Sequence, residues 1–259
     1  MQTQSGVPIV IGRSQQREEL LEALRDCVSG RGSVLLISGE PGIGKTTLCE
    51  EVARRAAGLG VSVAWGRCWE GSGAPSYWPW IQILRPMFQG TQAIGRESTR
   101  DRTLIARLIP ELRELESGPS VDGTSGELGL VARTADYEIE RFRLFQAVTA
   151  LLVKSVEETP LLLILEDCHA ADEASLLLTN FLAREVKQQR IAVLVSYRDA
   201  EVRLLPRVAE LIGDLAREGK VIDSGNRRLR ACLEAGRSRA RNVRSVLGAS
   251  SLEQSFAPQ

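Results

Sequence analysis

The sequence has little of several residue types, and each shortage excludes a class of protein. It contains a single histidine, His169, which excludes a metal site built from several imidazole groups. Its cysteines number five, an odd count without Cys-x-x-Cys spacing, which argues against a disulfide framework and against a zinc site. Apolar runs such as 161–165 are short, whereas a membrane-spanning helix needs about 20 predominantly apolar residues.

The chain also lacks an excess of charge of either sign. Acidic and basic residues number 33 each, so nothing in the overall charge indicates binding to nucleic acid or to an anionic membrane. Residues 1–6 lack the basic segment and apolar stretch that begin a signal peptide, so we expect a cytoplasmic protein. A hydrophobic content of 43% and a charged content of 25% are ordinary for a globular protein, which excludes a disordered or fibrous chain.

The order of predicted elements indicates an α/β fold. A helix is predicted over 17–28, a buried strand over 33–38, a helix over 45–57 and a second strand over 61–65. This strand–turn–helix–strand order is a βαβ unit, so we expect a mainly parallel central sheet flanked by helices. The remaining predictions are a loop or short helical turns over 71–80, a helical stretch to about 116 and a mobile surface segment over 117–129. Helices are also predicted over 138–156, 172–186 and 204–218, and strands over 161–165 and 191–196.

A glycine-rich turn follows the first predicted strand. Residues 39–46 read Gly-Glu-Pro-Gly-Ile-Gly-Lys-Thr and match G-x-x-x-x-G-K-[ST], the P-loop motif. Glycines let backbone N–H groups surround a phosphate, and the N-terminus of the next helix adds a favourable dipole. Lys45 would reach the β- and γ-phosphates, and the Thr46 hydroxyl would bind magnesium. The predicted nucleotide-binding residues are Gly39, Glu40, Pro41, Gly42, Ile43, Gly44, Lys45, Thr46 and Thr47.

A second motif is the apolar run 161–165 followed by Glu166 and Asp167, which has the form of a Walker B strand. A parallel strand beside the P-loop strand would deliver both carboxylates to the carboxyl edge of the sheet, where ligands bind in open α/β folds. One acid can hold magnesium, for which we name Glu166 together with Thr46, and the other can polarise the attacking water. The alternative is a buried strand followed by an ordinary acidic turn.

For each of the other candidate functional residues, a purely structural role is the alternative explanation. Arg198 ends the fourth predicted strand and could sense the terminal phosphate as a third catalytic residue, or it could form a surface ion pair with Asp199. His169 could orient groups near the phosphate, or it could be a hydrogen-bonded structural histidine. For the aromatic residues, core packing and loop anchoring are favoured over stacking on adenine or on a partner. These residues are Trp65, Trp69, Tyr77, Trp78 and Trp80.

Six segments occur in an order that resembles a known family. They are Ile-Gly-Arg at 11–13, the P-loop at 39–46, Trp-Gly-Arg-Cys-Trp-Glu at 65–70, Ala-Pro-Ser-Tyr-Trp-Pro-Trp at 74–80, Leu-Glu-Asp-Cys-His-Ala-Ala-Asp-Glu at 165–173 and Tyr-Arg-Asp at 197–199. Over residues 7–220 the chain resembles the N-terminal AAA-type P-loop ATPase domain of bacterial signal-transduction ATPases, the STAND class. Such domains occur in large LuxR-type transcriptional regulators and in adenylate cyclase-like proteins.

The resemblance implies ATP with magnesium as ligand and gives each motif a role. It places Lys45 and Thr46 on phosphate and magnesium, makes Glu166 and Asp167 the Walker B acids and makes Arg198 the sensor. It also places the segment 11–13 beside the adenine.

The chain departs from the family pattern in two places. Cys168 and Ala170 stand where family members usually have Leu and often Trp. Family chains also continue through a fifth strand, a helical lid and a winged-helix region, often to a DNA-binding helix-turn-helix, whereas residues 221–259 resemble none of these. A truncated or frameshifted gene is one explanation.

We therefore expect an ATP-binding domain at 1–220 that lacks its lid and an Arg-rich, poorly ordered tail at 221–259. The expected function is a nucleotide-dependent regulatory switch with slow magnesium-dependent ATP hydrolysis. A homo-oligomer or a regulatory protein is the candidate partner, and neither a membrane nor a legible DNA-binding motif is expected. A non-hydrolysing nucleotide-binding scaffold and a fragment of a DNA-binding transcriptional regulator are the alternatives.

Overall fold

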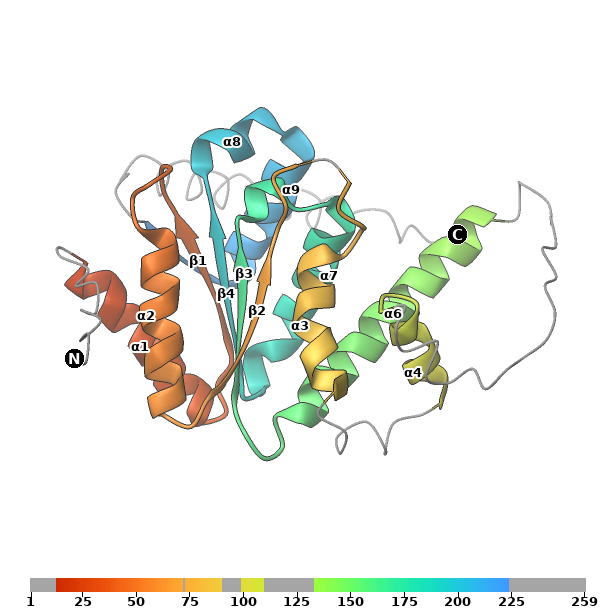
Figure 1. Ribbon diagram of the computed structural model, residues 1–259, viewed down its shortest axis with the longest axis horizontal. Coiled ribbons are helices and arrows are strands. Elements are labelled where there is room, and N and C mark those ends of the chain that lie inside the picture. The colour runs from red at the N-terminus through yellow and green to blue at the C-terminus, as the bar shows by residue number, and fades with distance from the viewer. Residues whose placement is uncertain (1–12, 72, 90–98, 110–132, 224–259) are drawn as a thin grey trace, which may run out of the picture.

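A computed structural model describes residues 13–71, 73–89, 99–109 and 133–223 of the chain. In this part of the chain one sheet of five strands has the order β2-β3-β4-β1-β5, and the paired strands are parallel. The strands are β1 (Ser33–Ser38), β2 (Ser62–Arg67), β3 (Leu161–Glu166), β4 (Ile191–Tyr197) and β5 (Lys220–Asp223). This is the predicted α/β class with a mainly parallel central sheet flanked by helices (Figure 1).

Helices cover both faces of the sheet (Figure 1). They are α1 (Ser14–Val28), α2 (Lys45–Gly58), α3 (Trp78–Gln89), α4 (Thr99–Ala106), α6 (Arg133–Ser155), α7 (Glu173–Glu185), α8 (Asp199–Leu204) and α9 (Pro206–Glu218), with 3₁₀ turns at Cys168–Ala170 and Val186–Gln188. Residues of α1 and α2 share one buried cluster with the sheet, and residues of α3, α6, α7 and α9 share another. Two covered faces explain why β3 and β4 are buried along their whole length and read as continuous apolar runs.

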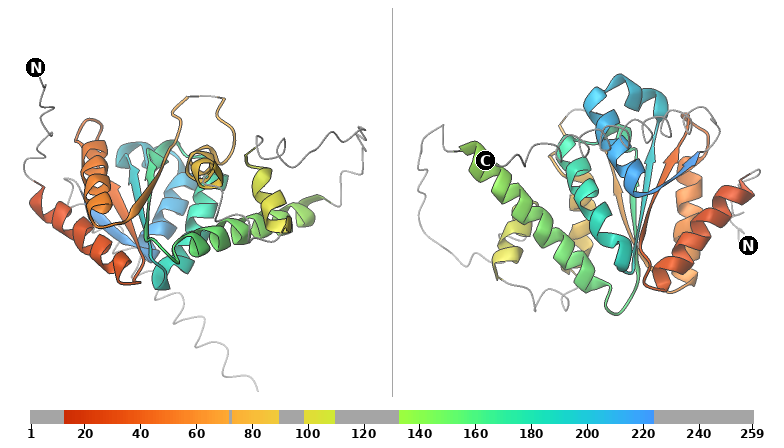
Figure 2. Two further views of the ribbon diagram at one scale, coloured as in Figure 1. Left: turned by 60° about the horizontal axis from the view of Figure 1, so that its bottom comes forward. Right: turned by 180° about the vertical axis from the view of Figure 1, so that it is seen from behind.

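The helical layers differ in how they are arranged. From behind, α7 and α9 lie side by side over the sheet, and they also make extensive contact with each other (Figure 2). On the opposite face α1 carries exposed ion pairs, such as Arg25–Glu18 at 3.0 Å.

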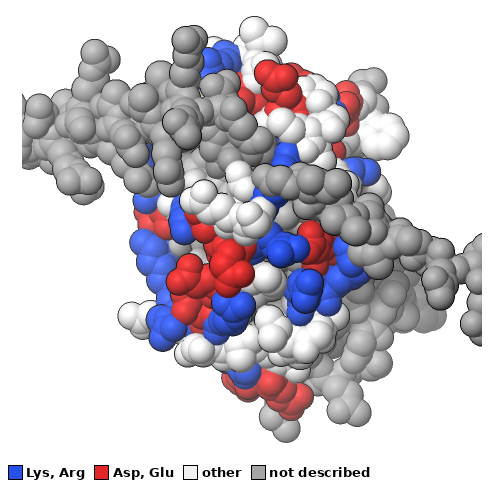
Figure 3. Space-filling model, turned by 90° about the vertical axis from the view of Figure 1, so that its left-hand side faces the viewer, with Lys and Arg blue, Asp and Glu red and all other residues white. Residues whose placement is uncertain are grey.

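Basic and acidic side chains are interspersed on the side of the molecule seen in Figure 3, so this side presents no continuous patch of one charge. No helix of the described residues is long and apolar enough to cross a membrane.

Four of the five strands were predicted from the sequence. β1 has its predicted bounds, and β2, β3 and β4 each run one or two residues further at their carboxyl ends. β5 was not predicted; it has four residues, pairs with β1 and buries Ile222. The expected division of the chain after residue 220 therefore falls within β5, and residues 224–259 of the expected tail lie outside the described residues.

Helix boundaries differ from the predictions at two places. The segment 71–80, predicted as a loop or short helical turns, ends within α3, which begins at Trp78 with Pro79 in its first turn, where proline is well tolerated. The helix predicted over 204–218 begins only at Pro206, and a separate helix, α8, precedes it. Leu205 has extended backbone angles because the following proline disfavours a helical conformation. The mobile segment predicted over 117–129 lies outside the described residues.

Gly66 determines how closely α3 approaches the edge of the sheet. A Cβ atom at this position would lie 2.2 Å from the carbonyl oxygen of Pro79, a distance that real contacts do not allow. Glycine therefore lets the start of α3 pack directly against β2. The N–H of Cys68, the first residue after β2, donates to the carbonyl oxygen of Glu166 at the end of β3.

Candidate functional site

The P-loop connects β1 to α2 in a conformation that glycine makes possible. Gly42 and Gly44 have φ angles of 75° and 87°, which lie in the left-handed region that glycine adopts without strain. A Cβ atom built on either residue would find no atom within 4 Å, so the space beside the loop is open. Because α2 begins at Lys45, the unpaired N–H groups of its first turn lie next to this space. The loop thus fits a phosphate group.

Lys45 is buried, and its ammonium group lies over the loop. Its Nζ donates hydrogen bonds to the carbonyl oxygens of Gly39 at 2.9 Å and Glu40 at 3.0 Å. Burial and, next, the charge of Arg198 lower the pKa of Lys45, while the charge of Asp167 raises it. A phosphate would be a stronger acceptor for this ammonium than the two carbonyls, because charge-assisted hydrogen bonds are about twice as strong as neutral ones.

Arg13 contacts the same loop. Its guanidinium donates to the carbonyl oxygen of Ile43 and, at 3.4 Å, to that of Gly44, and burial lowers the pKa of Arg13. The segment 11–13 was expected beside the adenine. Residues 11 and 12 lie outside the described residues, and the adenine assignment stays a prediction.

Glu166 is buried at the end of β3. Its Oε2 accepts a hydrogen bond of 3.0 Å from Nε1 of Trp65 and lies 3.3 Å from Nη2 of Arg67. Its Oε1 is buried and has no hydrogen-bond partner among the described residues. A buried carboxylate oxygen without a partner is costly unless something else binds there. This fits the predicted role of Glu166 toward magnesium.

Asp167 follows with an uncommon backbone conformation. Its φ is 57°, in the left-handed region, which Asp tolerates better than most residues. Its N–H donates to the Ser196 hydroxyl at 3.3 Å, and its Oδ2 lies 3.3 Å from Nε of Arg67. Thr46 and Thr47 lie in the first turn of α2 and are partly buried. Their predicted contacts with magnesium and nucleotide stay predictions.

Arg198 lies at the same edge of the sheet, as predicted, but its partners differ from the expected alternative. It pairs with Glu70 at 2.6 Å and with Glu201 at 2.8 Å, whereas Asp199 pairs with Arg203. The alternative prediction of an ion pair between Arg198 and Asp199 is therefore wrong.

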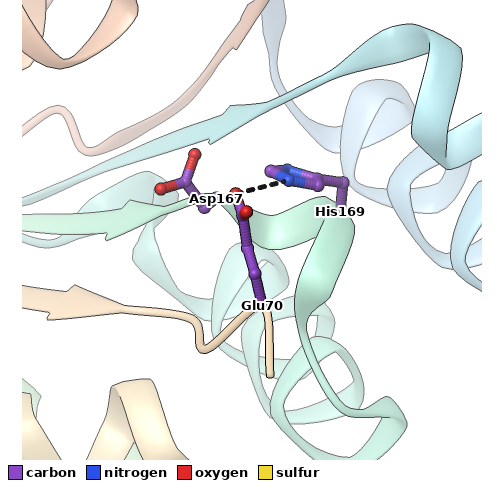
Figure 4. A group of neighbouring side chains, drawn as sticks. All are labelled: Glu70, Asp167 and His169. Carbon is purple, nitrogen blue, oxygen red and sulfur yellow. Dashed lines mark hydrogen bonds and ion pairs between the residues drawn. The ribbon is translucent and has the colours of Figure 1, made fainter. Parts of the chain in front are cut away.

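His169 is buried and contacts Glu70 and Glu201, the two acids that pair with Arg198. Its Nε2 lies 3.3 Å from Glu70 and 3.2 Å from Glu201. Ligand atoms of Glu70, Asp167 and His169 lie within 4.8 Å of one another. Figure 4 shows how these three side chains are grouped. Arg198 already neutralises Glu70, so we treat the group as hydrogen-bonded and assign it no metal.

The aromatic residues divide into two sets. Trp80 is fully buried and donates from Nε1 to the carbonyl oxygen of Ser175 at 3.1 Å, and buried Tyr77 packs edge-on against Phe145. Core packing is thus confirmed for these two. Trp65 packs against the core as well and also donates a hydrogen bond to Glu166, whereas Trp69 is 58% exposed.

Two further features, the buried cysteine thiols and a cavity beside β2, are candidate parts of the site. The four described cysteines, Cys27, Cys49, Cys68 and Cys168, are free and buried, and burial raises the pKa of Cys27 to about 11. A cavity of about 500 Å³ lies between β2 and α3 and is lined by residues 62–65, by α3 residues such as Gln82 and Met87, and by Ser155, Thr159 and Leu161. Its lining includes no residue of the P-loop. We therefore do not assign the cavity to the nucleotide.

Sequence reasoning did not single out three charged residues of the site: Arg67, Glu70 and Glu201. Arg67, the last residue of β2, and Glu70 belong to the family-like segment 65–70, which is the signal that could have found them. Glu201 lies three residues after Arg198, a spacing at which helical side chains meet.

Three comparisons with known proteins bear on the chain as a whole. Among solved structures, Cdc6p from Pyrobaculum aerophilum is 17% identical, with 85% of this chain and 47% of that chain covered and a TM-score of 0.45. The Aeropyrum pernix Orc1 protein in complex with DNA is 16% identical, with 86% and 48% covered and a TM-score of 0.40. The chain thus spans about half the length of these two proteins. No curated protein matches the sequence. The family model described as AAA ATPase domain matches residues 9–196, and the chain therefore belongs to the AAA ATPase domain family.

Proposed function

We propose that the chain binds ATP with magnesium at the P-loop and acts as a nucleotide-dependent regulatory switch. The observation that carries this proposal is the position of the Lys45 ammonium, held by the loop's own carbonyls beside the open space at Gly42 and Gly44. Lys45 and the N–H groups of α2 would bind the phosphates. The regulatory role rests on the resemblance to the STAND class and on membership of the AAA ATPase domain family.

The acids at the end of β3 support a hydrolytic role for this site. Thr46 and Glu166 would hold magnesium, which neutralises charge on the phosphates when bound. Asp167 would orient the attacking water for in-line attack on the γ-phosphate. Catalysis of this kind depends on positioning and charge neutralisation rather than on covalent chemistry.

We propose that this hydrolysis is slow. An arginine at the γ-phosphate contributes about 10³–10⁵ in rate. Here Arg198 is engaged by Glu70 and Glu201. A cation that is held by two carboxylates is not free to stabilise the transition state, so turnover would require that these pairs open or that a neighbouring molecule supplies the cation.

A non-hydrolysing scaffold is the second candidate, and one contact favours it. Arg67 lies 3.3 Å from both Glu166 and Asp167, so each acid is already paired with a cation. The DNA-binding alternative depends on residues 221–259, of which the structure describes only 221–223.

A titration with a fluorescent ATP analogue tests the proposed function. Lys45→Ala should weaken binding about 10- to 100-fold, because it removes one charge-assisted contact with the phosphates. Lys187→Ala is the matched control, since Lys187 is exposed and pairs with Glu218 on α9. Equal affinity of Lys45→Ala and wild type would overturn the assignment. Phosphate release measured on the same samples separates the switch from the non-hydrolysing scaffold.

A further inference from the structure

Four side chains at the site form a closed ring. Arg198 reaches Glu70 through Nη2 at 2.6 Å and Glu201 through Nη1 at 2.8 Å. Nε2 of His169 completes the ring, 3.3 Å from Oε1 of Glu70 and 3.2 Å from Oε2 of Glu201. Figure 4 shows the Glu70 and His169 part of it, with Asp167 beside them. Each acid thus contacts both basic groups.

The ring joins the carboxyl ends of three neighbouring strands. Glu70 follows β2, and His169 lies in the 3₁₀ turn after β3. Arg198 directly follows β4, and Glu201 lies in the first turn of α8. Carboxylates only accept hydrogen bonds, so Nε2 of His169 carries the proton that lies between them. The ring therefore ties the segment after β2 to the rigid centre of the sheet.

His169 is the fixed member of the ring, and the acids are the movable ones. His169 is buried, and its Nδ1 has no hydrogen-bond partner among the described residues. The side chain of Glu70 is 50% exposed. Glu70 can therefore leave the ring without uncovering the core, because exposed ion pairs contribute little to stability.

Arg198 lies beside the strand that leads into the P-loop, because it directly follows Tyr197 of β4, which pairs with Ser38 at the end of β1. After burial, the charge of Arg198 is the next cause that lowers the pKa of Lys45. A guanidinium binds a phosphate group with two parallel hydrogen bonds, and the fully charged γ-phosphate carries more charge than a single carboxylate. Phosphate and Glu70 therefore compete for the same cation.

We propose that Glu70 is a positioning residue that holds Arg198 while no γ-phosphate is bound, and that a nucleoside triphosphate draws Arg198 from Glu70 and so frees the segment after β2. This inference rests on the proposed nucleotide site. Trp69, the neighbour of Glu70, is 58% exposed and would report the release. Release of this segment would therefore depend on the third phosphate of the nucleotide and not on its nucleoside part.

The first test compares affinities for a non-hydrolysable ATP analogue and for ADP. Glu70→Gln removes the competing charge, so the ratio of ATP to ADP affinity should rise about 2- to 5-fold, the range that exposed ion pairs produce. Glu201→Gln should change the ratio in the same direction. Glu173→Gln is the matched control, because Glu173 is also an exposed acid paired with an arginine, Arg207.

The second test follows the intrinsic fluorescence of Trp69. The ATP analogue should change this signal and ADP should not, and Trp69→Phe and Arg198→Ala should each abolish the difference. An unchanged affinity ratio in both Glu70→Gln and Glu201→Gln, or the same fluorescence change with ATP and ADP, would overturn the inference while leaving the nucleotide site intact. Binding of neither nucleotide to the wild-type chain would overturn the proposed function itself.

Discussion

Nε1 of Trp65 donates a 3.0 Å hydrogen bond to Oε2 of Glu166 across two neighbouring strands. In the parallel register Trp65 lies opposite Ile164 and Arg67 lies opposite Glu166, so the indole reaches along the sheet toward its carboxyl end. One oxygen of Glu166 is thereby fixed by Trp65 and Arg67, and the other, Oε1, is left for a ligand. Trp65, which sequence reasoning assigned to packing, thus packs against the core and also supports the acid that we propose as a Walker B residue.

Trp65→Phe should destabilise the chain by about 1–3 kcal/mol, because Oε2 of the buried Glu166 loses a hydrogen bond. Chemical denaturation followed by circular dichroism measures this difference. Trp69→Phe provides the control, since this exposed side chain should change stability by less than about 0.5 kcal/mol. Equal effects of the two substitutions would show that the indole of Trp65 contributes only apolar contact.

Glu166→Gln and Asp167→Asn should leave nucleotide binding within about tenfold and remove magnesium-dependent phosphate release. Both substitutions keep the shape of the side chain but remove the charge that magnesium and the attacking water require. Paired measurements of analogue binding and phosphate release test this. Unchanged turnover in both variants would place the catalytic acids elsewhere in the chain.

Asp172 connects α7 to the segment before α3. Its carboxylate accepts hydrogen bonds from the N–H of Ser175 at 2.9 Å, as the N-cap of α7, and from the N–H of Tyr77 at 3.2 Å. Asp172→Ala should lower the free energy of unfolding by about 0.5–2 kcal/mol through loss of the cap alone. Asp172→Asn retains an acceptor for the cap and should cost less in the same thermal denaturation. Equal losses would show that charge rather than capping is what matters.

The ring at Arg198 should make stability depend on pH in a defined direction. The hydrogen bond from Arg198 lowers the pKa of Glu201 below its ordinary value of 4.5. A lowered pKa means that the folded state favours the charged carboxylate, so its contribution is present above pH 4.5 and is lost as the pH falls through the folded pKa. The difference in Tm between wild type and Glu201→Gln should be seen at pH 7 and should vanish in more acidic buffer. A difference that grows toward acid would contradict this assignment.

Much of the fold could be predicted from local pattern. The apolar runs that became β1, β3 and β4 were recognised because strands covered on both faces need apolar residues at every position. The P-loop was recognised because its glycines are required by the local backbone conformation, which a short motif encodes. β5 was missed because an edge strand of four residues leaves too short a pattern.

What the sequence determined by itself is the P-loop and the chain positions of Lys45, Glu166 and Asp167, since each depends on neighbours within a few residues. What only the tertiary structure decided is which side chains meet at the sheet edge. Arg198 pairs with Glu70, 128 positions earlier in the chain, rather than with the adjacent Asp199. The physical reason is that parallel pairing of β2, β3 and β4 brings three strand ends together, and no local spacing encodes the order in which those strands lie side by side.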